Sequence, residues 1–420
     1  MELLVLFFIC QFLITRDLAN AQDNYDDCGQ IEPYQGEIRS YAPWTAGIFI
    51  HQNNSSPKFF SAATIIGPTT VLAIAPGPFG AILRGSNAQD GLPSPEIFTV
   101  VAGLSSTDFN STDKYSQSSQ VFYIEPDLTQ KDSNDLYHYV IYHLKTIFDF
   151  KTPFVKAICL YKELSPTTLA PTGWEFVATG FGIQSLQTKY GRLSLGKIQS
   201  ESTKVCSKYF RFHYKRELLD SSVYCGVKSG IGNRTLISTA LGSLGTRVST
   251  RGFCFLHGSI TMLQYNERWH IAGKIALIPD RKRGKCDDQS VYIYADVNNN
   301  RTLSWLKRSV NCSPDKFACE DPENTCVPVT SVCNGYEDCP GGKDEHSLYC
   351  VVQNPCSKDS KSPMHSCGVT GNCILESQLC DGKFDCLDGS DEKFEFCAKQ
   401  ASKLYTSKKP SNCPKLTVVK

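Results

Sequence analysis

A short acidic run close to the C-terminal end contains the residues best suited to bind a metal ion. The stretch CDGKFDCLDGSDE, residues 380–392, places five carboxylates within twelve residues, among them Asp381, Asp385, Asp391 and Glu392. Carboxylates at this density repel one another unless a cation lies among them, and Ca²⁺ prefers six or more oxygen ligands. The spacing therefore predicts a calcium site.

A second and weaker run precedes it. The stretch CNGYEDCPGGKDE, residues 333–345, offers Asp338, Asp344 and Glu345 but begins with Asn334. An amide oxygen can coordinate calcium, but one negative charge is lost. We therefore expect lower calcium affinity at residues 333–345 than at residues 380–392.

The elements that hold these acids must depend on disulfide bonds. Residues 312–397 contain twelve cysteines in two runs of six, and 16 acidic against 6 basic residues, a net charge of −10. Few large apolar residues remain, so neither run can bury a core of ordinary size. We expect two units, 312–350 and 356–397, each stabilised by disulfides and a metal ion, and then a basic tail at 398–420. Cys413 in the tail either pairs with another chain or stays free.

The N-terminal segment predicts secretion. Residues 3–14, LLVLFFICQFLI, form an apolar run of signal-peptide length, followed by the cleavage pattern Ala19-Asn20-Ala21. A membrane anchor is the alternative, but the run is shorter than the roughly 20 residues that a spanning helix needs. We expect a signal peptide at 1–21, an extracellular chain in which disulfides persist, and no later membrane span. In a secreted chain, the Asn-x-Ser/Thr motifs predict glycosylation at Asn53 or Asn54, Asn110, Asn233 and Asn300.

Residues 28–310 have the pattern of a mainly β domain. Strand-length apolar runs are separated by Gly, Pro, Ser and Asn, for example at 45–50, 63–67, 98–103, 121–125, 175–182 and 271–278. One helix is expected at 302–310, where Leu303, Leu306 and Val310 share a face. The segment is long for one barrel and ordinary for two. The whole chain has 43 basic and 42 acidic residues, a balance that argues against nucleic acid as a partner.

The two cysteine-rich units resemble LDL-receptor class A modules, in the order of their cysteines and in their acidic runs. The resemblance implies calcium ligands from the side chains of Asn334, Asp338, Asp344 and Glu345 in the first unit, and of Asp381, Asp385, Asp391 and Glu392 in the second. It adds the carbonyl groups of Ser331 and Tyr336, and of Gln378 and Lys383, as further ligands. It also implies first-to-third, second-to-fifth and fourth-to-sixth disulfides. These are Cys312–Cys326, Cys319–Cys339 and Cys333–Cys350, then Cys356–Cys373, Cys367–Cys386 and Cys380–Cys397. The aromatic residue with which such modules usually bind a partner's lysine is replaced by Ser331 and Gln378.

The larger domain resembles a trypsin-like serine protease over roughly residues 28–308. AICL, GWEFVATGFG, SVYCGV, WHIAGKIAL and CDDQSVYIYADVNNNRTLSWLK occur in the family's order and at near-family spacing. The resemblance implies a chymotrypsin-like fold of two β-barrels. It also implies three disulfides, Cys28–Cys159, Cys206–Cys225 and Cys254–Cys286.

The catalytic residues of that family are replaced. Acyl transfer in this fold needs a nucleophilic Ser, a His base, an orienting Asp and an oxyanion hole. In the run VLAIAPGP the His position is Pro76, and the Asp position falls near His138, or at Asp135 in another register. In FLHGSITML an ungapped match places Gly258 at the nucleophile, whereas a slip of one residue would place Ser259 there.

Other parts of the machinery are altered as well. Leu256 takes the place of the oxyanion-hole glycine, and His257 that of the Asp which pairs with the new N-terminus of active relatives. The specificity position maps near Gly252, which has no charge. The stretch at 36–49, GEIRSYAPWTAGIF, lacks the activation start in which Arg precedes Ile-Val-Gly-Gly.

These replacements favour a binding protein over an enzyme. We expect a secreted, catalytically inactive serine protease homologue that acts as an adaptor or decoy in an extracellular proteolytic cascade, immune or developmental. Its partner would be a protease, an inhibitor or a cascade substrate. The acidic units are suited to basic patches on a second protein. The alternatives are an active endopeptidase with a non-standard site and a lipoprotein-binding or endocytic protein.

Overall fold

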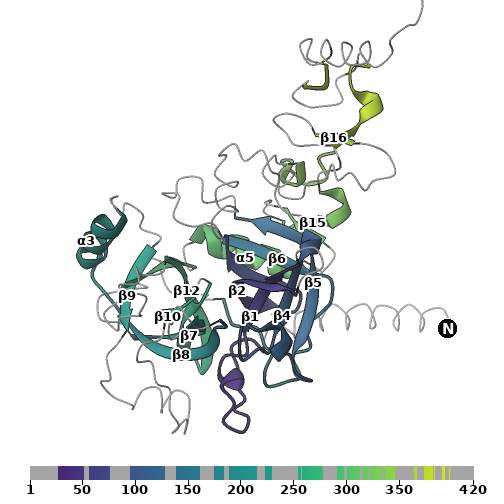
Figure 1. Ribbon diagram of the computed structural model, residues 1–420. Helices are drawn as coiled ribbons and strands as arrows, with labels where there is room; N and C mark the ends of the chain where they lie inside the picture. The colour runs from purple at the N-terminus through teal and green to yellow at the C-terminus, as the bar shows by residue number, and fades with distance from the viewer. Residues whose placement is uncertain are drawn as a thin grey trace, which may run out of the picture. The chain divides into compact units, whose positions relative to one another are not determined.

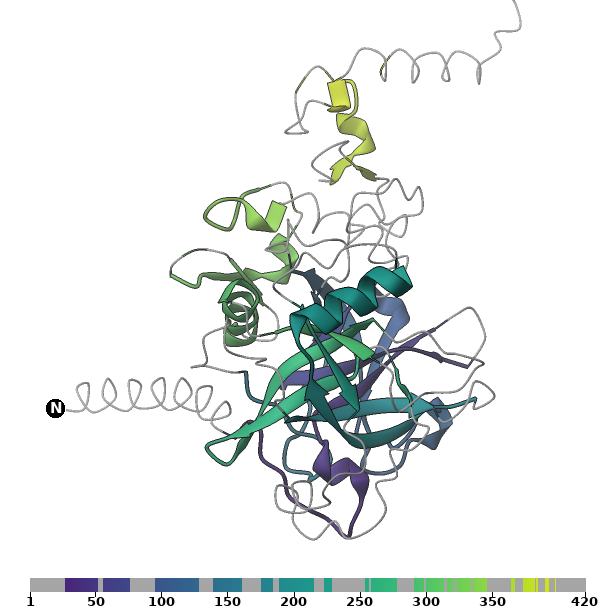
Figure 2. The same cartoon turned by 90° about the vertical axis from the view of Figure 1, so that its left-hand side faces the viewer.

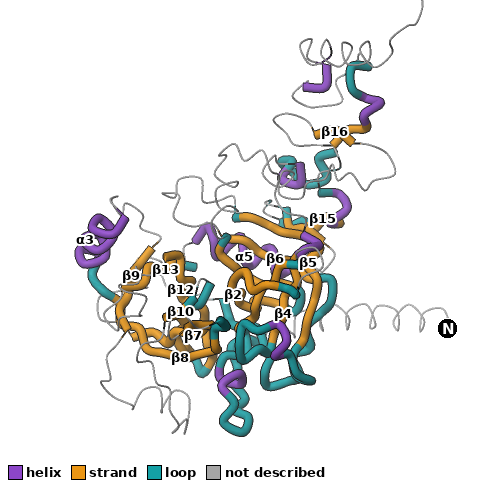
Figure 3. The backbone as a smooth tube through the Cα atoms, in the orientation of Figure 1, coloured by secondary structure: helices purple, strands orange, loops and turns teal. Residues whose placement is uncertain are grey.

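The computed structural model describes residues 27–51, 56–75, 95–127, 139–160, 175–183, 189–214, 223–228, 254–256, 258–277, 291–297, 300–312, 316–319, 321, 323–332, 334, 336–345, 364–366, 373–381, 383, 390–392 and 397. The chain divides into two compact units, Met1–Ala318 and Cys319–Lys420. Strands predominate in the first unit (Figure 3).

Six antiparallel strands close a first barrel (Figure 1). In order around the barrel they are β1 (Thr45–Ile50), β2 (Lys58–Gly67), β3 (Thr70–Ile74), β6 (Tyr139–Leu144), β5 (Gln117–Pro126) and β4 (Phe98–Ala102). β3 and β6 are buried along their whole length, as expected for continuous runs of apolar residues. Closure of the barrel leaves no free sheet edge.

A second barrel follows along the chain. Its strands are β7 (Glu175–Ile183), β8 (Arg192–Ser200), β9 (Val223–Lys228), β13 (Val291–Asp296), β12 (Arg268–Leu277) and β11 (Ile260–Tyr265). The ring closes because β7 pairs with both β8 and β11. The short β10 (Cys254–Phe255) pairs with the end of β7. The expected mainly β fold of two barrels is confirmed.

The two barrels contact each other directly. The rings of Phe59 on β2 and Phe181 on β7 meet edge to face, with their centroids 5.7 Å apart. The connecting segment bonds to both barrels, because Ile158 donates its N–H to Ile65 on β2 and Cys159 donates its N–H to Trp269 on β12. The barrels therefore share one interface, at which the candidate site lies.

Two helices are attached to the barrels. α3 (Thr203–Tyr214) lies on the outer surface of the second barrel (Figure 2), and the sequence did not predict it. α5 (Asn300–Asn311) confirms the helix expected at 302–310. Trp305 and Leu306 are its fully buried apolar residues, whereas Leu303 and Val310 are half-buried. Among the described residues, no helix combines the length and apolar character needed to cross a membrane.

The remaining elements are short. In the first unit they are η1 (Ile38–Tyr41), η2 (Pro95–Ile97), η3 (Phe109–Ser111) and β14 (Lys316–Ala318). In the second unit they are β15 (Cys326–Pro328), η7 (Val329–Ser331), η8 (Lys343–Glu345), β16 (Met364–Ser366), β17 (Cys373–Leu375), η9 (Glu376–Gln378) and η10 (Ser390–Glu392). The set β15, η7 and η8 recurs as β17, η9 and η10. Each counterpart begins 47 residues later, at 373 against 326, 376 against 329 and 390 against 343.

Candidate functional site

The strands that lead to the first two expected triad positions are neighbours. β3 ends at Ile74 and β6 begins at Tyr139, and these two residues are paired on adjacent antiparallel strands. The sheet therefore brings the two strand ends together, as a catalytic pair would require. The predicted positions that lie outside the described residues are Pro76, Asp135, His138, Gly252 and His257.

Ser259, the hydroxyl closest to the expected nucleophile position, is buried. It is the one hydroxyl in Cys254–Ser259, and its residue is 1% exposed. Its Oγ donates a hydrogen bond to the Leu256 carbonyl at 2.8 Å, and its N–H lies 3.3 Å from the same oxygen. A tight turn thus encloses the hydroxyl, which does not face solvent or a substrate.

Gly258 occupies a position that accepts no side chain. Its φ of +83° lies in the left-handed region, which favours glycine. A Cβ at this residue would lie well inside van der Waals contact of the Ala62 carbonyl oxygen on β2. The expected oxyanion donor is also engaged, because the Leu256 N–H donates to the Phe181 carbonyl at 2.7 Å.

A lysine that the sequence analysis did not single out lies beneath this turn. Lys274 on β12 is completely buried, and its Nζ donates to the Gly258 carbonyl and to Thr64 Oγ1, both at 2.7 Å. Burial lowers the pKa of this amine well below its usual value. Its signal in the sequence was a single cation inside the apolar run at 271–278. The lysine therefore links β2 of the first barrel to the turn that contains Gly258 in the second.

The histidines whose side chains are described bond to other groups. His51 Nε2 lies 2.8 Å from Thr99 Oγ1, and His143 Nε2 lies 2.9 Å from Glu125 Oε2. His270 Nδ1 donates to the Arg268 carbonyl at 3.2 Å, and burial lowers the pKa of its ring. None of these contacts supplies a base to Ser259.

A buried carboxylate connects the first barrel to α5. Glu125 is fully buried, and its Oε1 accepts hydrogen bonds from Trp305 Nε1 at 2.8 Å and from Ser309 Oγ at 3.0 Å. Its other oxygen contacts His143. One turn earlier in the helix, Thr302 Oγ1 donates to Asp127 at 3.0 Å. The buried face of α5 thus combines the hydroxyl groups of Thr302 and Ser309 with the apolar Trp305 and Leu306, and this network belongs to the scaffold.

The segment that matches the activation region is firmly held. Arg39 in η1 is 7% exposed, and its guanidinium donates to the Gly103 carbonyl at 3.0 Å and to Asp113 at 2.8 Å. Burial acts to raise the pKa of Asp113, but hydrogen bonds from the Tyr115 N–H and from Arg39 hold that pKa below its usual value. Arg39 also lies over the Phe154 ring at 4.5 Å. This arginine is not presented to a trypsin-like protease.

In the first cysteine repeat, the predicted calcium ligands are already partly bonded. Asp344 is fully buried and accepts N–H groups from Asp338 at 2.7 Å and from Cys339 at 3.1 Å. Asn334 donates its amide to Asp338 at 2.8 Å and accepts the Tyr336 N–H. The Tyr336 carbonyl accepts the N–H of Asp338. Glu345 is buried as well, whereas Ser331 is half-buried.

In the second repeat, Asp391 is fully buried, and the Oε1 atom of Glu392 is buried with no hydrogen-bond partner among the described residues. Asp381 accepts the Lys383 N–H at 2.9 Å, in the same turn that Asn334 and Tyr336 form 47 residues earlier, at 334 against 381 and 336 against 383. Gln378 ends η9, and Asp385 lies outside the described residues. Within the described part of the chain, no group of three or more His, Cys, Asp or Glu is assembled to hold a metal ion.

Four of the implied disulfides are present in the structure. They are Cys28–Cys159, Cys206–Cys225, Cys319–Cys339 and Cys380–Cys397. Cys312 and Cys326 are disulfide-bonded as well. The remaining implied pairs, Cys254–Cys286, Cys333–Cys350, Cys356–Cys373 and Cys367–Cys386, involve residues outside the described side chains, as does Cys413.

One of the predicted glycosylation sites is described with its side chain. Asn110 is exposed in η3, where its N–H is capped by Asp108 Oδ1 at 3.1 Å. The side chain therefore has room for a glycan. Asn300 is the first residue of α5, and Asn53, Asn54 and Asn233 lie outside the described residues.

Comparison with known families matches the first cysteine repeat. Residues 310–350 match the family model of the low-density lipoprotein receptor domain class A, whose members typically bind calcium. No protease family is matched, although the two six-stranded barrels are consistent with a chymotrypsin-like fold. A search of the curated proteins gives no match. The disulfides and the class A domain indicate an extracellular protein of several domains.

Proposed function

We propose that this protein is a secreted, catalytically inactive homologue of trypsin-like proteases that acts as a binding adaptor in an extracellular proteolytic cascade. The observation that carries the proposal is the burial of Ser259, whose hydroxyl hydrogen is bonded to the Leu256 carbonyl. A serine attacks a peptide only when its oxygen reaches the substrate and a base accepts its proton.

The neighbouring positions support the same proposal. Gly258 has no space for a side chain, and the Leu256 amide is bonded within the protein. Loss of one oxyanion-hole donor alone lowers kcat by about 10²–10³-fold, and loss of a triad member leaves only about 10³–10⁴-fold acceleration over water. A domain that lacks all of these groups retains the shape of a protease without its chemistry.

The first class A domain supports a role in binding. Tyr336 is 76% exposed, and the neighbouring Asn334, Glu337 and Asp338 are exposed as well. An accessible ring beside carboxylates attracts Lys and Arg through cation–π and ionic contacts. Basic patches of a cascade protein therefore suit this surface.

Calcium binding belongs to the same proposal. When bound, the ion would neutralise the clustered carboxylates of each repeat. The buried Asp344 and Asp391 and the buried Oε1 atom of Glu392 fit this requirement, because a carboxylate removed from water needs a counter-charge. The 47-residue repetition of elements, at 326 to 373, 329 to 376 and 343 to 390, supports a second class A module at 356–397.

A serine-directed fluorophosphonate tests the catalytic part of the proposal. We expect the full chain to remain unlabelled under conditions that label an active trypsin-like protease completely. Labelling that maps to Ser259, and is lost in S259A, would contradict it and favour an endopeptidase.

Cross-linking followed by pull-down, with and without a calcium chelator, tests the binding part. We expect a protease, an inhibitor or a cascade substrate to be captured with calcium and to be lost on chelation. Lipid or lipoprotein in the captured material, without any cascade protein, would favour a carrier instead.

A further inference from the structure

One face of α3 is a row of cations. Lys204, Lys208 and Arg211 are all exposed and follow one another at i, i+4 and i+7, a spacing that places them on the same side of a helix. At about 1.5 Å of rise per residue, the row is roughly 10 Å long. The helix Thr203–Tyr214 contains no Asp or Glu that would neutralise it.

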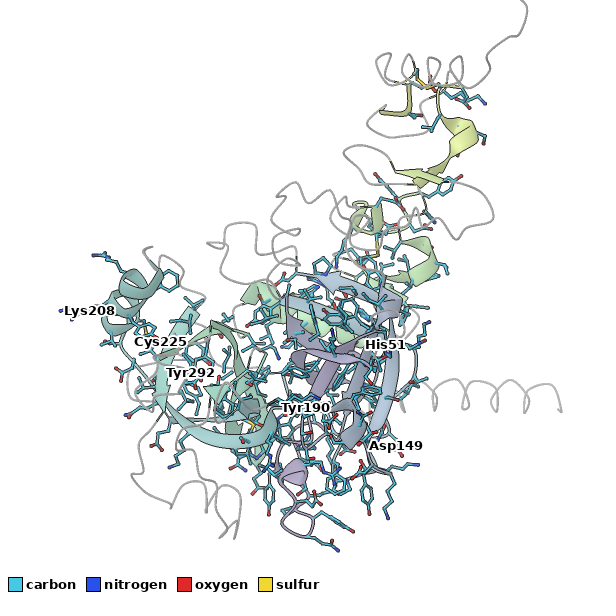
Figure 4. All side chains as sticks on the ribbon, viewed as in Figure 1. His51, Asp149, Tyr190, Lys208, Cys225 and Tyr292 are labelled. Carbon is cyan, nitrogen blue, oxygen red and sulfur yellow. A yellow bond between two sulfur atoms is a disulfide. The ribbon has the colours of Figure 1, made fainter. Side chains whose placement is uncertain are left out.

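The opposite face fixes the helix to the barrel. Cys206 and Phe210 are buried in one cluster with Val291 and Ile293 of β13. A disulfide joins Cys206 to Cys225 on β9, so the helix cannot turn its charged face inward. Figure 4 shows Lys208 at the periphery of the second barrel, with Cys225 between the helix and the sheet.

The row lines a hollow of about 510 Å³, formed by Lys204, Ser207, Lys208 and Arg211. Lys204 and Lys208 take part in none of the ion pairs of the described residues. Like charges four residues apart repel each other, and a cation in the first turn, as at Lys204, opposes the helix dipole. The arrangement is therefore unfavourable for the isolated helix and suits an anionic ligand.

We infer that this face binds a sulfated polysaccharide of the extracellular matrix. Sulfate groups are permanent anions along an extended chain, and ammonium and guanidinium groups in a row pair with them. A protein partner would normally insert apolar or aromatic anchors into a desolvated centre. The described lining of this hollow offers three cations and a serine instead. The inference is independent of the adaptor role, because it depends neither on calcium binding nor on the turn that contains Gly258 and Ser259.

Affinity for heparin, used as the probe, tests the inference with the full chain. In K204Q/K208Q/R211Q we expect binding at physiological salt to weaken by at least about tenfold. We also expect the slope of log affinity against log salt to become shallower by about two to three. In the native chain, heparin should protect Lys204 and Lys208 from an amine-reactive label, a readout that needs no variant to fold.

The basic tail supplies the matched control, because Lys399, Lys403 and Lys408 carry the same number of charges. K399Q/K403Q/K408Q should bind heparin like the native chain, and desulfated heparin should not bind. Loss of binding in the tail variant alone, or absence of protection at Lys204 and Lys208, would overturn the inference. Binding of polyglutamate as strong as that of heparin would also overturn it, in favour of an acidic protein partner.

Discussion

Gly258, which an ungapped match to the protease family puts at the nucleophile position, leaves no room for a side chain. A serine at this residue would need a Cβ where the Ala62 carbonyl already lies, and a left-handed φ that side chains rarely adopt. The barrier is therefore steric as well as chemical. On the proposed function, a histidine introduced at Pro76 would not be enough for catalysis, because a side-chain nucleophile at position 258 would still have no space.

Replacement of Gly258 measures this barrier. We expect G258A to lower the free energy of unfolding by at least about 2 kcal/mol, because backbone strain and overpacking act together. Chemical denaturation of the full chain gives the value. G36A is the matched control, because Gly36 has a similar φ of +72° but no atom within 4 Å of the point that a Cβ would occupy. G36A should lose about 1 kcal/mol; an equal loss in both variants would show that Ala62 gives way.

Lys274 should make the free energy of unfolding of the first unit depend on pH, with a rise that continues into the alkaline range. Its pKa in the folded chain is lowered by burial, whereas the unfolded chain has a pKa of about 10.4. Between these values the unfolded state binds more protons, so the free energy of unfolding rises as the pH rises and levels off above the unfolded pKa. In K274M this contribution is absent.

The difference between the native chain and K274M, measured by urea unfolding at pH 7 and pH 9, tests this expectation. The native chain should gain stability relative to K274M at the higher pH, by at most about 1.4 kcal/mol per pH unit. Groups that titrate in both proteins cancel in the comparison. K151M, which removes an exposed lysine, should show no such change. A constant difference for K274M would mean that the buried amine keeps its proton.

The residue types at the triad positions could be read from the sequence, since a proline in VLAIAPGP cannot be a base. The contacts of Lys274 could not be read from the sequence. They join β12 to Thr64 on β2, 210 positions earlier in the chain, and depend on how the two barrels meet. Likewise, the burial of Ser259 follows from a turn geometry that the letters FLHGSITML leave open.

At the scale of elements, α5 shows docking through polar groups. Its buried face contains Thr302 and Ser309, which bond Asp127 and Glu125 of the first barrel. Sequence periodicity predicted Leu303, Leu306 and Val310. Leu306 is fully buried, whereas Leu303 and Val310 are half-buried, and the buried hydroxyl groups were missed because periodicity counts apolar residues only. Ser309 and the Trp305 indole satisfy the buried carboxylate of Glu125, which a buried acceptor requires.

Two serines on α5 test this docking with one chemical change. S309A should lower the free energy of unfolding by about 1–3 kcal/mol, because a buried carboxylate loses a donor. S304A, on the exposed side of the same helix, should change it by less than about 0.5 kcal/mol. Thermal or chemical unfolding of the full chain provides both values. Equal effects would show that Glu125 does not depend on the helix.

The sequence did not predict the helix α3, and its buried face shows why. Its buried face rests on Cys206 and Phe210, a pattern too short to stand out among the charged residues around it. The Cys206–Cys225 disulfide and the cluster on β13 stabilise the helix. The strands were more predictable, because closed barrels bury continuous apolar runs such as those of β3 and β6.

At the scale of the whole molecule, calcium should control the stability of the second unit. Calcium at about 100 times its Kd would stabilise a binding domain by about 2.7 kcal/mol, and extracellular modules bind it with Kd values of about 10⁻⁴–10⁻³ M. We therefore expect a chelator to lower the temperature of a calcium-dependent unfolding transition of the full chain. Differential scanning calorimetry with added calcium or chelator measures it.

Variants assign the effect to each repeat. D344N in the first repeat and E392Q in the second should each reduce the response to calcium, because both carboxyl groups are buried at predicted ligand positions. The exposed Glu337 and the non-ligand Glu376 provide matched controls as E337Q and E376Q. Control variants that reduce the response as much as D344N and E392Q would argue for diffuse attraction of the ion to the acidic surface.

The Cys28–Cys159 bond has a consequence for how this protein would look after proteolysis. It spans 131 positions, so a cut anywhere between the two cysteines leaves both fragments covalently joined. A nicked molecule would migrate as one band on a non-reducing gel and separate only after reduction. Closing a loop of this length also removes about 5 kcal/mol of chain entropy from the unfolded state. A clipped first barrel would therefore remain one covalently joined, two-chain protein.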